Sequence, residues 1–63
     1  MSLVELHRFD TPIEAELARL RLDAQGIRSI VFDAANLYAS VATGVRLMVD
    51  EEDKEEAEKA LGF

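Results

Sequence analysis

Few side chains in this sequence could take part in catalysis. His7 is the single histidine and there is no cysteine, which excludes a thiol nucleophile, a cysteine-based metal site and a histidine-rich metal site. His7 could act as a general base near neutral pH. However, Ser40, the best candidate nucleophile, does not lie in a nucleophile-elbow motif. We therefore predict no catalytic residue, no metal and no cofactor, and we interpret His7 as a surface or interface histidine.

Two aspartates and a loop between them form a second candidate site. Asp10 follows the first predicted strand and Asp33 ends the second, and these strands are expected to run in the same direction, so both residues emerge at one end of the sheet. Segment 34–43 shows no regular period and holds apolar residues with no obvious place in a core. The predicted rim, for a small ligand or a protein partner, consists of Asp10, Asp33, Leu37, Tyr38, Ser40 and Thr43.

The spacing of the two aspartates limits their chemistry. With another strand between them, Asp10 and Asp33 are about 10 Å apart, which is too far to share a proton without a bridging ion. Aspartate is also a common turn residue, so we favour turns at both positions over a weak divalent-cation site.

The charge of the chain is concentrated in one segment. The net charge is −6, and residues 50–58 hold seven acids against Lys54, while the acids and bases of the remainder cancel. A nucleic-acid or anionic membrane surface needs a basic footprint, so neither is an expected partner. The longest apolar run is too short to span a bilayer, and residues 1–5 lack the features of a signal peptide, so we expect a cytoplasmic protein.

The elements that must position these residues can be predicted from periodicity and caps. Residues 2–9 alternate as a half-buried strand. Thr11, Pro12 and Glu14 resemble a capping box, which predicts a helix over 12–25 that ends at Gly26.

The predicted helix has two apolar faces. Ile13, Leu17, Leu20 and Ala24 fall on one narrow stripe, which we expect to be buried. The opposite face carries Ala15, Ala18 and Leu22, and we expect it to be exposed, since alanine is a good helix former and single exposed leucines are common.

The second half of the chain predicts two strands and a helix. Residues 27–33 are rich in β-branched and aromatic residues, and 45–49 alternate after Gly44. A second helix is expected to begin after the cap Asp50 and to end at Gly62. Its inner face holds Ala57, Ala60 and Leu61.

The order β-α-β-β-α predicts an α+β domain spanning residues 1–63. A right-handed crossover leaves a slot between the first two strands, and the third strand enters it antiparallel to both. The result is a ferredoxin-like split fold with a three-stranded antiparallel sheet of order 1-3-2 and two helices on one face.

The first strand then has an unpaired edge, and the second face of the sheet is uncovered. We expect a homodimer through that edge or through the open face, predicted as Leu3, Glu5, His7, Arg46 and Met48.

Three blocks resemble a known bacterial family: residues 6–18, residues 24–27, and residues 44–53 with Ala57. This family is catalogued as "putative prokaryotic signal-transducing protein", a domain of unknown function whose fold is likened to the PII nitrogen-regulatory proteins. The chain departs from it at Asp50, where the family often has proline. The resemblance implies a compact ferredoxin-like domain in a bacterial cytoplasm. It also implies a partner-binding role for 34–43, the position of the PII partner loop, while no nucleotide-binding residue can be transferred.

Our first functional hypothesis is a non-enzymatic binding or regulatory module that acts on a protein partner through 34–43 or through the open face. The alternative is a sensor of a small metabolite or cation at the rim of Asp10 and Asp33. An enzyme would require a site completed by another subunit.

Overall fold

The computed structural model describes residues 2–33 and 44–63 of the chain. Its elements are β1 (Leu3–Phe9), α1 (Pro12–Ala24), β2 (Ser29–Asp33), β3 (Val45–Asp50), a 3₁₀ turn (Glu51–Asp53) and α2 (Lys54–Leu61). The predicted order β-α-β-β-α is therefore confirmed. Four residues of the predicted rim, Leu37, Tyr38, Ser40 and Thr43, lie outside the described residues.

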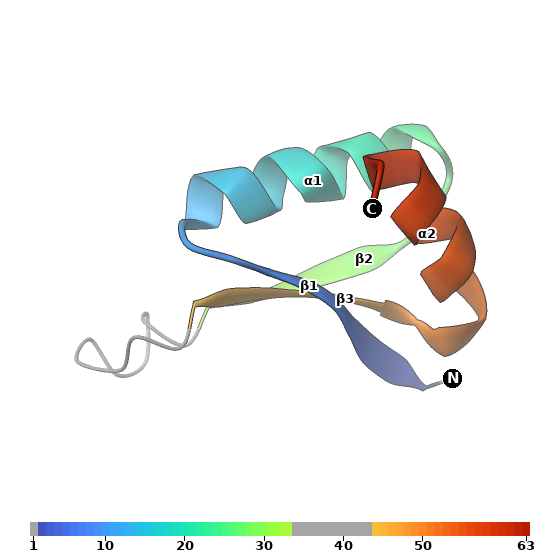
Figure 1. Cartoon of the computed structure of the whole chain (residues 1–63), viewed down its shortest axis with the longest axis horizontal. Helices are drawn as coiled ribbons and strands as arrows, with labels where there is room; N and C mark the ends of the chain where they lie inside the picture. The colour runs from blue at the N-terminus through green and yellow to red at the C-terminus, as the bar shows by residue number, and fades with distance from the viewer. Residues whose placement is uncertain (1, 34–43) are drawn as a thin grey trace.

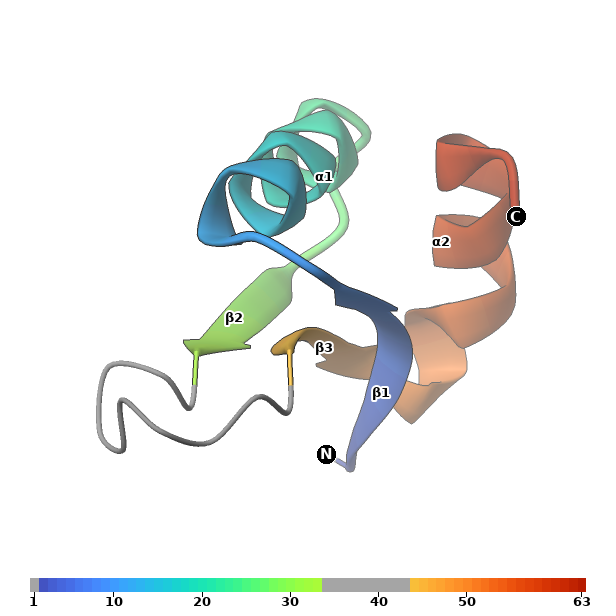
Figure 2. The ribbon, with the colours of Figure 1, turned by 60° about the vertical axis from the view of Figure 1, so that its left-hand side comes forward.

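The sheet has the predicted order β1-β3-β2, and both outer strands run antiparallel to the central β3. Both helices lie on one face of this sheet (Figure 1). α1 packs mainly against β2, while α2 lies beside α1 on the β1 side (Figure 2). The predicted fold class, strand order and helix placement are confirmed.

Local capping determines where α1 begins and ends. The Thr11 hydroxyl accepts a hydrogen bond from the backbone N of Glu14 at 3.3 Å, and Pro12 occupies the first turn, where its missing N–H removes no helical bond. Gly26 follows the helix with φ of 77°, a left-handed conformation that favours glycine. These three residues explain why α1 matches its predicted range to within one residue.

The buried face of α1 is the opposite of the predicted one. Ala15, Ala18 and Leu22 are buried, whereas the expected core residues Ile13, Leu17 and Leu20 are 73%, 57% and 49% exposed. Short alanine side chains allow the helix axis to lie close to the sheet, and Leu22 then reaches the core. The face of α1 with more large apolar residues is therefore not the buried one, because the fit between helix and sheet determines which face packs.

Strand β3 supplies the centre of the core. Val45, Leu47 and Val49 are buried beneath the helices, and they alternate with the exposed Arg46. Ala57 is the fully buried residue of α2, as predicted, with Ala60 and Leu61 partly buried beside it. The core is small because two alanines from α1 and one from α2 occupy helix positions where larger side chains could bury more surface.

The second helix begins later than predicted. Asp50 caps the following residues, since its Oδ1 accepts a hydrogen bond from the backbone N of Glu52 at 3.0 Å. These residues form a 3₁₀ turn, and the α-helix starts at Lys54. Such turns are frequent at helix N-termini. Gly62, with φ of 81°, ends α2 as expected.

A β-bulge in β1 shifts the register of the sheet. Glu5 pairs with Met48, but His7 pairs with Leu47, which leaves Leu6 as the extra residue of the edge strand. His7 thus pairs with a residue that is buried beneath the helices. Its ring stacks on the ring of Phe63, with 4.4 Å between the ring centroids, and packs edge-on against the ring of Phe9, with 4.6 Å between the centroids. The prediction that His7 lies on the uncovered face is wrong, because strict alternation does not continue through a bulge.

A buried hydroxyl in β2 gives a test of the core. The Oγ of Ser29 is buried, and no described group forms a hydrogen bond with it. Because an unsatisfied buried polar group is costly, we expect Ser29→Ala to raise the free energy of unfolding by about 1 kcal/mol, measured by urea denaturation. The exposed Ser2 gives the matched control, and Ser2→Ala should be neutral. A clear loss of stability in Ser29→Ala would show that this hydroxyl has a partner.

Candidate interaction surface

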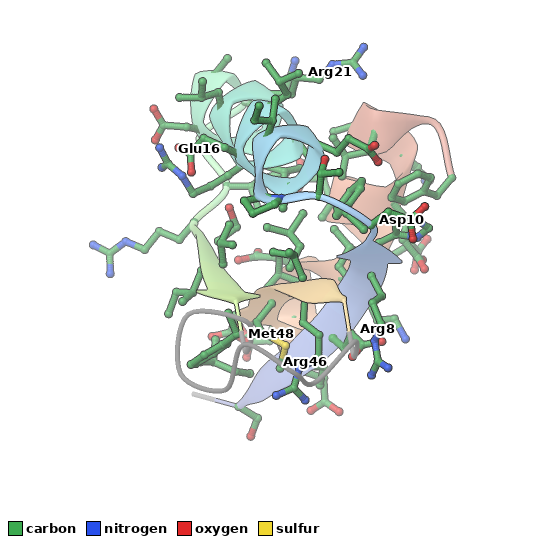
Figure 3. All side chains as sticks on the ribbon, turned by 90° about the vertical axis from the view of Figure 1, so that its left-hand side faces the viewer. Arg8, Asp10, Glu16, Arg21, Arg46 and Met48 are labelled. Carbon is green, nitrogen blue, oxygen red and sulfur yellow. The ribbon has the colours of Figure 1, made fainter. Side chains whose placement is uncertain are left out.

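The uncovered side of the sheet carries an ordered set of apolar and charged side chains, which we call the open face. Cross-strand pairing arranges them in rows: Phe32, Arg46 and Arg8 form one row, and Ile30, Met48 and Glu5 form the next. Leu3, the first residue of β1, pairs with Asp50 and continues the surface beyond the second row. Figure 3 shows Arg8, Arg46 and Met48 on the side of the sheet away from the helices. The open face consists of Leu3, Glu5, Arg8, Ile30, Phe32, Arg46 and Met48.

The apolar part of the open face is substantially exposed. Leu3, Ile30 and Phe32 are 42%, 45% and 47% exposed, and Met48 between them is half-buried. A shallow groove of about 160 Å³ opens beside Leu3 and Ile30, with Arg28, Ser29 and Asp50 on its walls. Aromatic residues, methionine and arginine are the types enriched in protein–protein interfaces. The composition of the open face is therefore typical of a surface that binds another protein.

The charges of the open face are arranged unfavourably for an isolated molecule. Arg8 lies directly opposite Arg46, and like charges at paired positions of a sheet are destabilising. An Nη of Arg8 donates to the Oε1 of Glu5 at 3.0 Å, which offsets one of these charges. Among the described residues, no ion pair involves Arg46. A carboxylate brought by a partner would relieve this repulsion.

The structure brings together four of the five residues predicted for the uncovered face. Leu3, Glu5, Arg46 and Met48 lie there, while His7 does not. Sequence reasoning missed Ile30, Phe32 and Arg8. The first two could have been found from their alternation with Val31, but Arg8 reaches this face only because of the bulge at Leu6.

The two aspartates of the predicted rim leave the same end of the sheet. Phe9 and Asp33 both pair with Val45, so Asp10 and Asp33 emerge on either side of β3, about two strand spacings or 10 Å apart.

Within residues 2–33 and 44–63, no group of three histidine, cysteine or acidic side chains could hold a metal ion. No described helix is long and apolar enough to cross a membrane.

These features define a small α+β domain with helices on one face of its sheet and an exposed, partly apolar surface on the other. Residues 3–62 match the family described as "putative prokaryotic signal transducing protein", and the chain belongs to this family. The resemblance found in three sequence blocks is thereby confirmed over nearly the whole chain. Comparison with curated proteins and with solved structures found no match.

Proposed function

We propose that this chain is a non-enzymatic regulatory module of its signal-transducing family, which works by binding another protein across the open face. The observation that carries the proposal is the row of Phe32, Arg46 and Arg8, in which an exposed aromatic ring adjoins two facing arginines. Exposed apolar side chains supply burial energy on binding, and arginines supply charge-assisted hydrogen bonds.

The chemistry of the open face also indicates what the partner presents. Phe32, Ile30 and Leu3 fit a segment with apolar side chains, and the facing arginines fit one or more carboxylates next to it. The chain as a whole has a net charge of −6, so long-range attraction does not favour an acidic partner. Recognition would therefore depend on short-range contacts with Arg8 and Arg46, and these weaken as salt increases.

Affinity purification from a bacterium that carries the protein, followed by quantitative mass spectrometry, tests the proposal. Phe32→Ser and Arg46→Glu each change an exposed residue of the open face. Lys59→Glu, on the exposed surface of α2, makes the same charge change as Arg46→Glu and is the matched control. We expect a protein that is captured by the wild type and by Lys59→Glu, and is lost with both open-face variants.

Two results would contradict this function. The first is a set of captured proteins that is the same for all four chains, and the second is the absence of any captured protein. Raising the salt concentration should also release the partner from the wild type, since a carboxylate–arginine contact is expected.

A further inference from the structure

The outer surface of α1 carries an apolar ridge that the core leaves unused. Ile13, Leu17 and Leu20 are 73%, 57% and 49% exposed, and Ala24 continues the same stripe at the end of the helix. The ridge lies on the opposite side of α1 from Ala15, Ala18 and Leu22, so it faces away from the sheet. It is thus a surface separate from the open face.

We propose that this ridge is the dimerisation surface of the protein, where a second copy lays its own α1 antiparallel across it about a twofold axis. This inference goes beyond the proposed function, which concerns the open face and a different protein. It rests on the order of apolar side chains along the ridge and on the charges that flank it.

The spacing of the ridge suits an antiparallel pair. Successive residues of a helix rise by about 1.5 Å along its axis. The number of a residue therefore gives its height, which we call its level, and the residues of two antiparallel helices that lie at the same level can be identified. When the twofold axis passes between positions 17 and 18, Ile13 falls between the levels of Leu20 and Ala24 of the partner subunit. Leu17 meets Leu17 of the partner subunit at the centre. The apolar side chains then interleave along the contact instead of colliding.

The charges beside the ridge obey the same symmetry. Glu14 and Arg21 lie on one flank, about 90° and 70° around the helix from the ridge, and Glu16 and Arg19 lie on the other, about 70° and 130° around from it. In an antiparallel twofold pair, each flank meets the same flank of the other copy. An axis between positions 17 and 18 places Glu14 opposite the partner's Arg21.

The second flank agrees with this axis. The same operation brings Glu16 opposite the partner's Arg19, so acid meets base on both sides of the ridge. A parallel twofold pair would instead bring Glu14 near the partner's Glu16. Within one chain, Arg19 donates from its Nε to Glu16 at 2.8 Å, and this hydrogen bond holds the pKa of Glu16 below its ordinary value. Glu16 is therefore charged at neutral pH, and in the dimer its carboxylate would be shared between Arg19 of its own chain and the partner's Arg19.

The two surfaces expected from the sequence to join copies are less suitable. The bulge at Leu6 interrupts the edge of β1, and bulges hinder strand addition at a sheet edge. The open face carries the paired arginines Arg8 and Arg46, whose charges a contact between copies there would cover. The ridge avoids both problems, although its small area predicts a weak, concentration-dependent dimer.

Sedimentation equilibrium from low micromolar to millimolar protein tests the dimer. We expect the wild type to move from the 7.0 kDa monomer to twice that mass. Leu17→Gln should remain a folded monomer, because the residue is exposed in the single chain. Ile30→Gln, an equally polar change on the open face, should dimerise like the wild type. A wild type that stays monomeric, or a Leu17→Gln chain that dimerises normally, would overturn the proposal.

Complementary charge variants test the antiparallel arrangement. Glu14→Arg and Arg21→Glu each create two like-charge contacts per dimer, and we expect each to weaken association about tenfold. Mixing the two variants pairs Arg with Glu at both contacts and should restore association to within about threefold of the wild type.

Charge-matched changes on α2 provide the controls, namely Glu56→Arg in its first turn and Lys59→Glu in its last turn. Neither should alter dimerisation, and circular dichroism verifies that every variant is folded. A mixture of Glu14→Arg and Arg21→Glu that associates no better than either chain alone would exclude the antiparallel ridge contact. The readout is self-association, so it is independent of whether the open face captures another protein.

Discussion

Leu22→Ala should cost far more stability than Leu17→Ala, although both truncate a leucine of the same helix. Leu22 is fully buried in the core, and truncating a buried leucine typically lowers the free energy of unfolding by about 2–5 kcal/mol. Leu17 is 57% exposed, so in the monomer its truncation should cost less than about 1 kcal/mol. A domain of this length is expected to have a total of only about 3–9 kcal/mol, so Leu22→Ala should leave much of the chain unfolded.

Urea denaturation followed by circular dichroism measures both variants. It should be carried out at low micromolar concentration, where self-association through the ridge contributes little. The helix propensity change is the same at both positions, so the difference between them reports burial alone. A greater loss of stability in Leu17→Ala than in Leu22→Ala would indicate that the face of α1 that carries Leu17 packs on the sheet.

Gly44→Ala is the second substitution with a large expected effect. Gly44 precedes β3 with φ of 81°, and a non-glycine residue there costs about 1–2 kcal/mol. A Cβ at this position would also lie 2.9 Å from the Cγ of Arg8 and 3.0 Å from the carbonyl oxygen of Phe9. The side chain of Arg8 can move, but the carbonyl of Phe9 belongs to β1. We therefore expect a total loss of about 2–4 kcal/mol.

Gly26→Ala separates the two contributions. Gly26 has a similar φ of 77°, but apart from its chain neighbours no atom of the described residues lies within 4 Å of a Cβ placed there. This variant should lose only the conformational part, about 1–2 kcal/mol. Equal losses in the two variants, measured by urea denaturation, would show that the approach of β1 to Gly44 is not tight.

The predictable parts of the fold were those set by local interactions. Thr11, Pro12 and Gly26 satisfy or remove the unpaired backbone groups of α1, so they mark its ends without reference to the rest of the molecule. The alternation of Val45, Leu47 and Val49 with Arg46 likewise identifies a strand with one buried face. Chain order and the handedness of crossovers then led to the sheet order 1-3-2.

The candidate surface was only partly predictable. The uncovered face follows from the topology, and four of its residues follow from alternation. Arg8 and His7 exchange their expected positions because one extra residue in β1 reverses the alternation after it. Since a bulge depends on how two strands fit together, the sequence of β1 alone does not reveal it.

The sequence by itself determined the elements, their caps, their order and the concentration of negative charge in residues 50–58, because these depend on neighbouring residues and on composition. Only the tertiary structure decided which face of α1 is buried and which residues form the open face. An amphipathic pattern identifies the apolar face of a helix, but α1 has two apolar faces, and the pattern alone does not show which of them is buried. The close approach that Ala15 and Ala18 permit over the sheet selected one, and this left Ile13, Leu17 and Leu20 at the surface.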